Sequence, residues 1–209
     1  MKMMKNTRPA PLALVASMLL LGCITGCASR SADLRLTSLA TKAAYTQQFT
    51  DAYVAKGAAG NTEVVLTNDD GEVRHVMHVK VLWRPQRGTK QSHPSYTNAG
   101  IHWYVFNQGQ GARTASAAAA TAAPDVLEYT GAGFVRLSET AAGTKVTIRN
   151  ATLKPTDASA ECSLNDPVGP SRLNGTFLAK KSTKRVNALL AEVKHATEGP
   201  RQQQASAAE

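Results

Sequence analysis

The stretch Val73–Arg84 has the clearest strand pattern in the chain, because its residues alternate strictly between two faces. Successive side chains of a β-strand point to opposite sides, so apolar residues can gather on one face and polar residues on the other. The face that we predict to be buried carries Val73, His75, Met77, Val79, Val81 and Trp83, and the opposite face carries Arg74, Val76, His78, Lys80, Leu82 and Arg84. Pro85 has no amide hydrogen and ends the strand. Residues 68–71 are turn formers that come just before Val73, and they predict a hairpin that leads into this strand.

Similar short runs recur along the chain, separated by turns rich in Gly, Pro and Asn. Residues 45–56 also fit a helix, but the turn at 57–61 and the β-branched run that follows favour a strand. Glycines at 131 and 133 predict a bend or bulge within another strand. The predicted strands are 45–56, 62–67, 73–84, 100–106, 125–137, 144–153 and 173–180.

A single helix follows the last predicted strand. Ser182 or Thr183 can cap its first turn, and Gly199-Pro200 breaks it beyond His195. Its apolar residues fall at relative positions 0, 3, 4 and 7, which places one stripe against a sheet: Val186, Leu189, Leu190 and Val193. The sequence therefore predicts a mostly β fold, a single antiparallel β-sandwich or open barrel of about seven strands with one C-terminal packing helix.

The N-terminus predicts export. Lys2, Lys5 and Arg8 precede the apolar run 12–21, which leads into the small residues of 22–29. A positive segment, a short apolar segment and a small-residue cleavage site form a secretory signal peptide. The apolar run is too short to span a bilayer as a helix.

Two overlapping motifs end this signal, Leu20-Leu21-Gly22-Cys23 and Ile24-Thr25-Gly26-Cys27. Each resembles the lipobox of bacterial lipoproteins, in which cleavage frees the cysteine for attachment of acyl chains such as palmitate. Cys27 is favoured as the lipidated residue because a polar start, Ala28-Ser29-Arg30, follows it. Cys23 is the alternative because it comes directly after the apolar run. A further alternative is an ordinary signal peptide with incidental cysteines.

The resemblance also implies a location, and the residue patterns divide the chain into segments. Ala28 at the second mature position implies sorting to the outer membrane, facing the periplasm, in a cell with two membranes. We expect a signal peptide at 1–26, a tether at 27–44, a β-rich domain at 45–197 with an Ala-rich insertion at 109–123, and a disordered tail at 198–209.

The chain is basic, with a formal net charge of +9, of which three charges belong to the signal. In an envelope compartment such a surface meets phospholipid headgroups or anionic polymers, so no nucleic-acid partner is expected. The expected partners are the membrane through the N-terminal lipid, and an envelope protein or anionic polymer. Simple solubility is the competing explanation of the charge.

The loop after the central strand has the densest set of groups suited to an anion or sugar. Arginine offers a bidentate fork and tryptophan a stacking face, and loops on a rigid β scaffold often carry binding residues. The predicted ligand-binding residues are Trp83, Arg84, Arg87, Lys90 and His93.

Histidines near the central strands suggest a metal site, but their spacing argues against it. His75 and His78 are three residues apart on one strand and point to opposite faces, so only one of them can join His93 and His102. We therefore predict no metal and no cofactor. Cys162 is alone in the mature chain if Cys27 carries lipid, and a pairing of Cys27 with Cys162 is the alternative if Cys23 does.

No catalytic motif with its required structural context occurs in the sequence. We therefore expect a lipid-anchored envelope protein of non-catalytic type, which binds or scaffolds a partner through a basic β-domain. The alternative is an envelope hydrolase or metal-dependent enzyme whose site assembles only in space.

Overall fold

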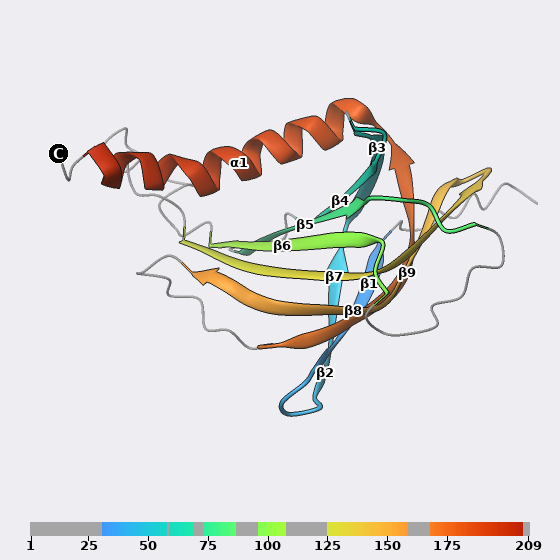
Figure 1. Ribbon diagram of the computed structural model, residues 1–209, viewed down its shortest axis with the longest axis horizontal. Helices are drawn as coiled ribbons and strands as arrows, with labels where there is room; N and C mark the ends of the chain where they lie inside the picture. The colour runs from blue at the N-terminus through green and yellow to red at the C-terminus, as the bar shows by residue number, and fades with distance from the viewer. Residues whose placement is uncertain are drawn as a thin grey trace, which may run out of the picture.

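The computed structural model describes residues 31–57, 59–68, 73–86, 96–107, 125–158 and 168–206. This part of the chain contains nine strands and one helix (Figure 1). They are β1 (Ala32–Ser38), β2 (Ala44–Phe49), β3 (Asp51–Lys56), β4 (Thr62–Asn68), β5 (Val73–Val81), β6 (Ala99–Asn107), β7 (Asp125–Thr140), β8 (Gly143–Ala158), β9 (Ser171–Lys181) and α1 (Thr183–Ser206).

Seven of the strands close a barrel. From β3 to β9 each strand is antiparallel to the next, and β9 returns to β3 through a short parallel pairing. The predicted class, mostly β with one C-terminal packing helix, is confirmed. The barrel is closed rather than open because β9 uses both of its edges, one on β8 and the other on β3.

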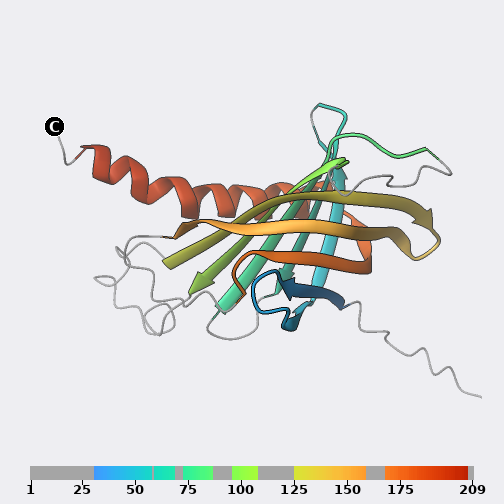
Figure 2. The same ribbon diagram turned by 60° about the horizontal axis from the view of Figure 1, so that its bottom comes forward.

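One edge of β9 is shared by two partners. Its first half pairs antiparallel with β1, where Leu34 lies opposite Gly175. Its end pairs with β3, where Val54 lies opposite Lys181. The antiparallel ladder of β1 and β2 thus joins the barrel wall as two extra strands (Figure 2). Residues 27–44 were expected to be a tether, and the structure corrects this: β1 lies within them, with Ala32, Leu34 and Leu36 buried.

The barrel interior is an apolar core to which every barrel strand contributes. In β5 the predicted inner face is confirmed, since Met77, Val79 and Val81 are buried there. The pattern stops at Val81, where β5 ends, and Trp83 is exposed rather than buried. The largest fully buried side chains are Tyr129, Phe49, Leu34, Leu36, Leu66, Met77, Ile101, Ile148, Leu153 and Leu173.

Helix α1 covers the outside of the barrel across β3 to β6 (Figure 1). Its predicted stripe is confirmed, since Val186, Leu189 and Val193 pack on outward side chains such as Val65 and Val76. Its start is also as predicted, because the Ser182 hydroxyl accepts the Arg185 amide at 3.3 Å.

The C-terminal end of α1 differs from the sequence prediction. The helix continues to Ser206, through Gly199-Pro200 and into the predicted tail 198–209. A proline removes one backbone hydrogen bond from a helix, a cost that does not always end the element.

Strand β7 contains the predicted glycine irregularity. Its pairing with β8 shifts register between Ala132 and Phe134. A Cβ on Gly131 would lie 1.7 Å from the Thr152 carbonyl oxygen, and a Cβ on Gly133 would lie 2.4 Å from the Cβ of Ala151. The two glycines allow β8 to cross β7 at a distance that a larger residue would prevent. The Ala-rich insertion 109–123 lies outside the described residues.

Candidate functional site

The segment after β5, residues 82–86, and the segment before β6, residues 96–98, place three large apolar side chains at the same end of the barrel. Leu82 is 62% exposed, Trp83 48% and Tyr96 62%. We call Leu82, Trp83 and Tyr96 the apolar rim patch. Exposed aromatic and aliphatic side chains grouped in this way are typical of interaction sites, and Trp and Tyr are enriched among residues that dominate binding energy.

A buried asparagine holds this segment in place. Asn98 is fully buried, and its amide nitrogen donates to the carbonyls of Trp83 (2.9 Å) and Val135 (2.8 Å). Its amide oxygen accepts the Val135 amide at 2.7 Å, and its backbone carbonyl accepts the Leu82 amide at 2.8 Å. Asn98 therefore ties the chain after β5 to β7, and the apolar rim patch stands on a rigid base.

Two more contacts hold the side chains of Trp83, in the patch, and of Arg84, which follows it in the chain. The Trp83 ring meets the Phe134 ring edge to face, with centroids 6.5 Å apart. The Arg84 guanidinium donates to the Thr62 hydroxyl at 3.3 Å, and its side chain is exposed. Of the predicted ligand-binding residues, Trp83 thus contacts β7 and Arg84 contacts β4, whereas Arg87, Lys90 and His93 lie outside the described residues.

The same end of the barrel is rich in exposed cations. The end of β9, the start of α1, the β7–β8 hairpin and the segment after β5 lie on one side of the molecule (Figures 1 and 2). Lys181 donates to Glu139 at 2.8 Å, and this bond lowers the pKa of the Glu139 carboxyl, with a smaller contribution from the charge of Arg84. We call the exposed cations of this end the basic rim: Lys56, Arg84, Lys145, Lys181, Lys184 and Arg185.

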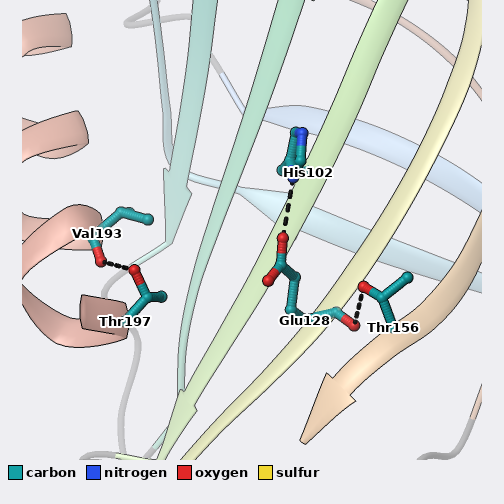
Figure 3. A network of polar contacts seen from close by, with 5 residues as sticks. All are labelled: His102, Glu128, Thr156, Val193 and Thr197. Atoms are coloured by element: carbon teal, nitrogen blue, oxygen red, sulfur yellow. Dashed lines mark hydrogen bonds and ion pairs between the residues drawn. The ribbon is translucent and has the colours of Figure 1, made fainter. Parts of the chain in front are cut away.

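A second polar cluster crosses the outer wall of β4 to β7. His78 bonds Glu63, and His102 Nδ1 lies 2.9 Å from the Glu128 carboxylate (Figure 3). The two imidazoles lie on adjacent strands, stacked with centroids 6.4 Å apart. Burial lowers the pKa of His78, opposed by its bond to Glu63. Each imidazole therefore has its own carboxylate partner.

Tyr104 lies beside this cluster, at the edge of the helix contact. Its ring stacks on that of His102 with centroids 6.1 Å apart. Burial, followed by the charge of Glu128 and a bond to it, raises the pKa of the phenol to about 12. Tyr104 is therefore protonated at neutral pH and is a poor acid or nucleophile.

The third histidine of these strands, His75, lies on the other side of the wall. His75 points into the barrel, where it stacks on Trp103 at 5.7 Å, and Trp103 stacks on Tyr129 at 4.8 Å. Burial lowers the pKa of His75. As the strand geometry predicted, His75 and His78 face opposite ways and only His78 joins His102. Among the described residues no group of three or more His, Cys, Asp or Glu side chains is placed to hold a metal ion.

Sequence reasoning missed the residues that give the site its rigidity. In the sequence, Asn98 is visible only as a turn-forming residue just before a strand. No sequence pattern indicates its hydrogen bonds to Val135. Cys23, Cys27 and Cys162 lie outside the described residues. Within the described part, no helix is long and apolar enough to cross a membrane.

Comparison of the chain with protein-family models, with curated proteins and with solved structures finds no match in any of the three.

Proposed function

We propose that this protein is a lipid-anchored, non-catalytic component of the cell envelope, and that its barrel binds another envelope component through the basic rim and the apolar rim patch. The observation that carries this proposal is the exposure of Leu82, Trp83 and Tyr96 on the rigid base that Asn98 provides. Rigid apolar anchors surrounded by cations suit a protein partner or an anionic polymer.

The anchor follows from the lipobox resemblance. Cys27, or alternatively Cys23, would carry the acyl chains, and several chains together give firm membrane attachment, whereas a single one does not. The proposed location is the outer membrane, facing the periplasm. The first barrel-associated strand begins at Ala32, so attachment at Cys27 keeps the barrel next to the leaflet.

The non-catalytic part of the proposal is supported by the outer-wall cluster. Glu63 and Glu128 are bonded to imidazoles, and Tyr104 holds its proton strongly. A general base needs a substrate proton or a nucleophile within hydrogen-bond reach. These side chains instead form hydrogen bonds with one another.

Photo-crosslinking in cells tests the binding surface. A photoreactive phenylalanine derivative is placed at Tyr96, on the apolar rim patch, and as a matched control at Tyr45, an exposed tyrosine on β2. We expect adducts from position 96 that are absent from position 45 and that decline when Trp83→Ala and Arg84→Ala are combined. Equal labelling from both positions would contradict the proposal.

Mass spectrometry of the mature N-terminal peptide tests the anchor separately. We expect an acylated cysteine at Cys27, lost in Cys27→Ala. Acylation that persists in Cys27→Ala and disappears in Cys23→Ala would move the anchor to the alternative position. An unmodified N-terminal peptide would contradict the lipid anchor.

A further inference from the structure

We infer that the basic rim docks on the anionic headgroup surface of the leaflet that holds the lipid, with the apolar rim patch inserted at the interface. This inference rests on the proposed anchor and names the partner of the same surface. The reach of the N-terminal chain, the charge of the rim and the aromatic residues of the rim support it.

The chain between the anchor and the barrel is short enough to orient the domain. Five residue steps separate Cys27 from Ala32, a span of at most about 18 Å. Leu34 lies opposite Gly175, six residues before the end of β9 at Lys181. At ~3.3 Å per residue, Lys181 lies roughly 20 Å beyond Gly175 along the strand.

Strand β1 points its first residue toward the rim. Because β1 is antiparallel to β9, Ala32 lies closer to Lys181 than Leu34 does, at about 13 Å measured along the strand. The opposite end, where Ser38 pairs with Ser171, lies roughly 20 Å from Ala32 in the other direction. Ala32 is therefore nearer the rim than the opposite end, so an anchor at Cys27 favours the rim, and the charge of the rim selects that end. An anchor at Cys23 would reach both ends and leave the orientation to charge.

Charge and residue type at the rim match an anionic interface. Near such a surface each Lys or Arg contributes about a fivefold preference for the bound state, and the effect falls off within a Debye length. Trp and Tyr side chains concentrate at membrane interfaces, where an apolar ring meets polar headgroups. The basic rim and the apolar rim patch supply both groups on one face.

The two tryptophans of the chain permit a direct test. Trp83 is exposed at the rim, whereas Trp103 is 3% exposed inside the barrel. Lipidated full-length mature protein is reconstituted into vesicles of brominated phosphatidylcholine, with or without phosphatidylglycerol, and Trp emission is recorded after flotation. We expect strong quenching in the vesicles that contain phosphatidylglycerol, and no such change in Trp83→Phe, where only Trp103 remains.

Charge variants separate docking from simple attachment. The combination Arg84→Gln, Lys184→Gln and Arg185→Gln removes three rim cations, and Arg149→Gln, Lys154→Gln and Arg172→Gln removes three exposed cations from the β8–β9 wall as a matched control. We expect the rim variant to lower the ratio of docked to undocked domain by about a hundredfold, at about fivefold per cation. The wall variant should behave as the unaltered protein.

The outcomes distinguish the two proposals. Protein that fails to float with vesicles would contradict the lipid anchor and this inference with it. Protein that floats, but whose Trp83 emission is the same with and without phosphatidylglycerol, would overturn the docking alone and leave the rim to a protein partner. Equal quenching in the rim and wall variants would also overturn it.

Discussion

At the scale of single residues, Asn98 is the side chain on which the rim depends most. Its amide makes three hydrogen bonds to the backbone of Trp83 and Val135 from a fully buried position. Removing one partner of a buried bond leaves the other unsatisfied, at a cost of about 1–3 kcal/mol. We therefore expect Asn98→Ala to lower the free energy of unfolding by about 2–4 kcal/mol, measured by urea denaturation.

Gln48→Ala provides the comparison, since Gln48 is an exposed amide on β2. It should leave the unfolding midpoint nearly unchanged. If Asn98→Ala and Gln48→Ala gave the same midpoint, the backbone bonds of Asn98 would not support the rim.

His75 gives the barrel interior a dependence on pH. Burial lowers the pKa of His75 from its ordinary value of 6.5, so between the two values the unfolded chain binds the proton more readily. The contribution of His75 to the free energy of unfolding is fully present above pH 6.5 and is lost as the pH falls below 6.5. We expect the melting temperature to drop on acidification from neutral pH, and to drop less in His75→Phe.

The dependence should become smaller in His75→Phe without disappearing, because burial also lowers the pKa of His78. His195→Gln, at an exposed position of α1, is the control for a general loss of imidazole. An acid-induced drop of the same size in the parent chain and in His75→Phe would assign the effect to other groups.

At the scale of elements, the β7–β8 pair depends on its glycines. A Cβ at Gly131 would meet the Thr152 carbonyl oxygen at 1.7 Å, and the backbone cannot yield without breaking the ladder. We expect Gly131→Ala to lower the melting temperature strongly, by an amount that corresponds to several kcal/mol, roughly the cost of overpacking a core or more.

Gly100 offers a matched substitution on the neighbouring strand, opposite Ala132. Nothing lies within 4 Å of a Cβ built there, so Gly100→Ala should leave the melting temperature unchanged or raise it slightly. Similar losses in both variants would show that strand glycines act here through backbone freedom and not through the close approach of β8.

At the scale of the whole molecule, α1 is the cover of one barrel wall. Its stripe hides outward apolar side chains, among them Val65, Val76 and Phe106. A chain that ends after residue 182 should expose this patch, bind a hydrophobic dye and melt at a lower temperature. A chain that ends after residue 197 retains Val186 to Val193 and should melt as the full chain does. Equal melting of the two shortened chains would show that α1 adds little stability.

Local patterns predicted elements well and pairings poorly. The faces of β5 and the stripe of α1 follow from periods of two and 3.6 residues, which the sequence displays directly. Strand β1 was missed because Ala32 and Ser38 are small residues that give a weak alternation. The bonds of His78 to Glu63 and of His102 to Glu128 depend on strand register, and the base formed by Asn98 depends on a residue 37 positions away. Such contacts leave no local signal.

The shared edge of β9 has a consequence for how the chain acquires its structure. The last strand made is the one that joins β1, β3 and β8, so no ring of hydrogen bonds exists until residues 171–181 are available. Contacts this distant in sequence slow folding. If the chain is exported N-terminus first, as proposed, the barrel cannot close until the last strand has also crossed the membrane. The barrel then closes only after the lipid end is already at the membrane, and until that moment its open strand edges depend on protection from aggregation.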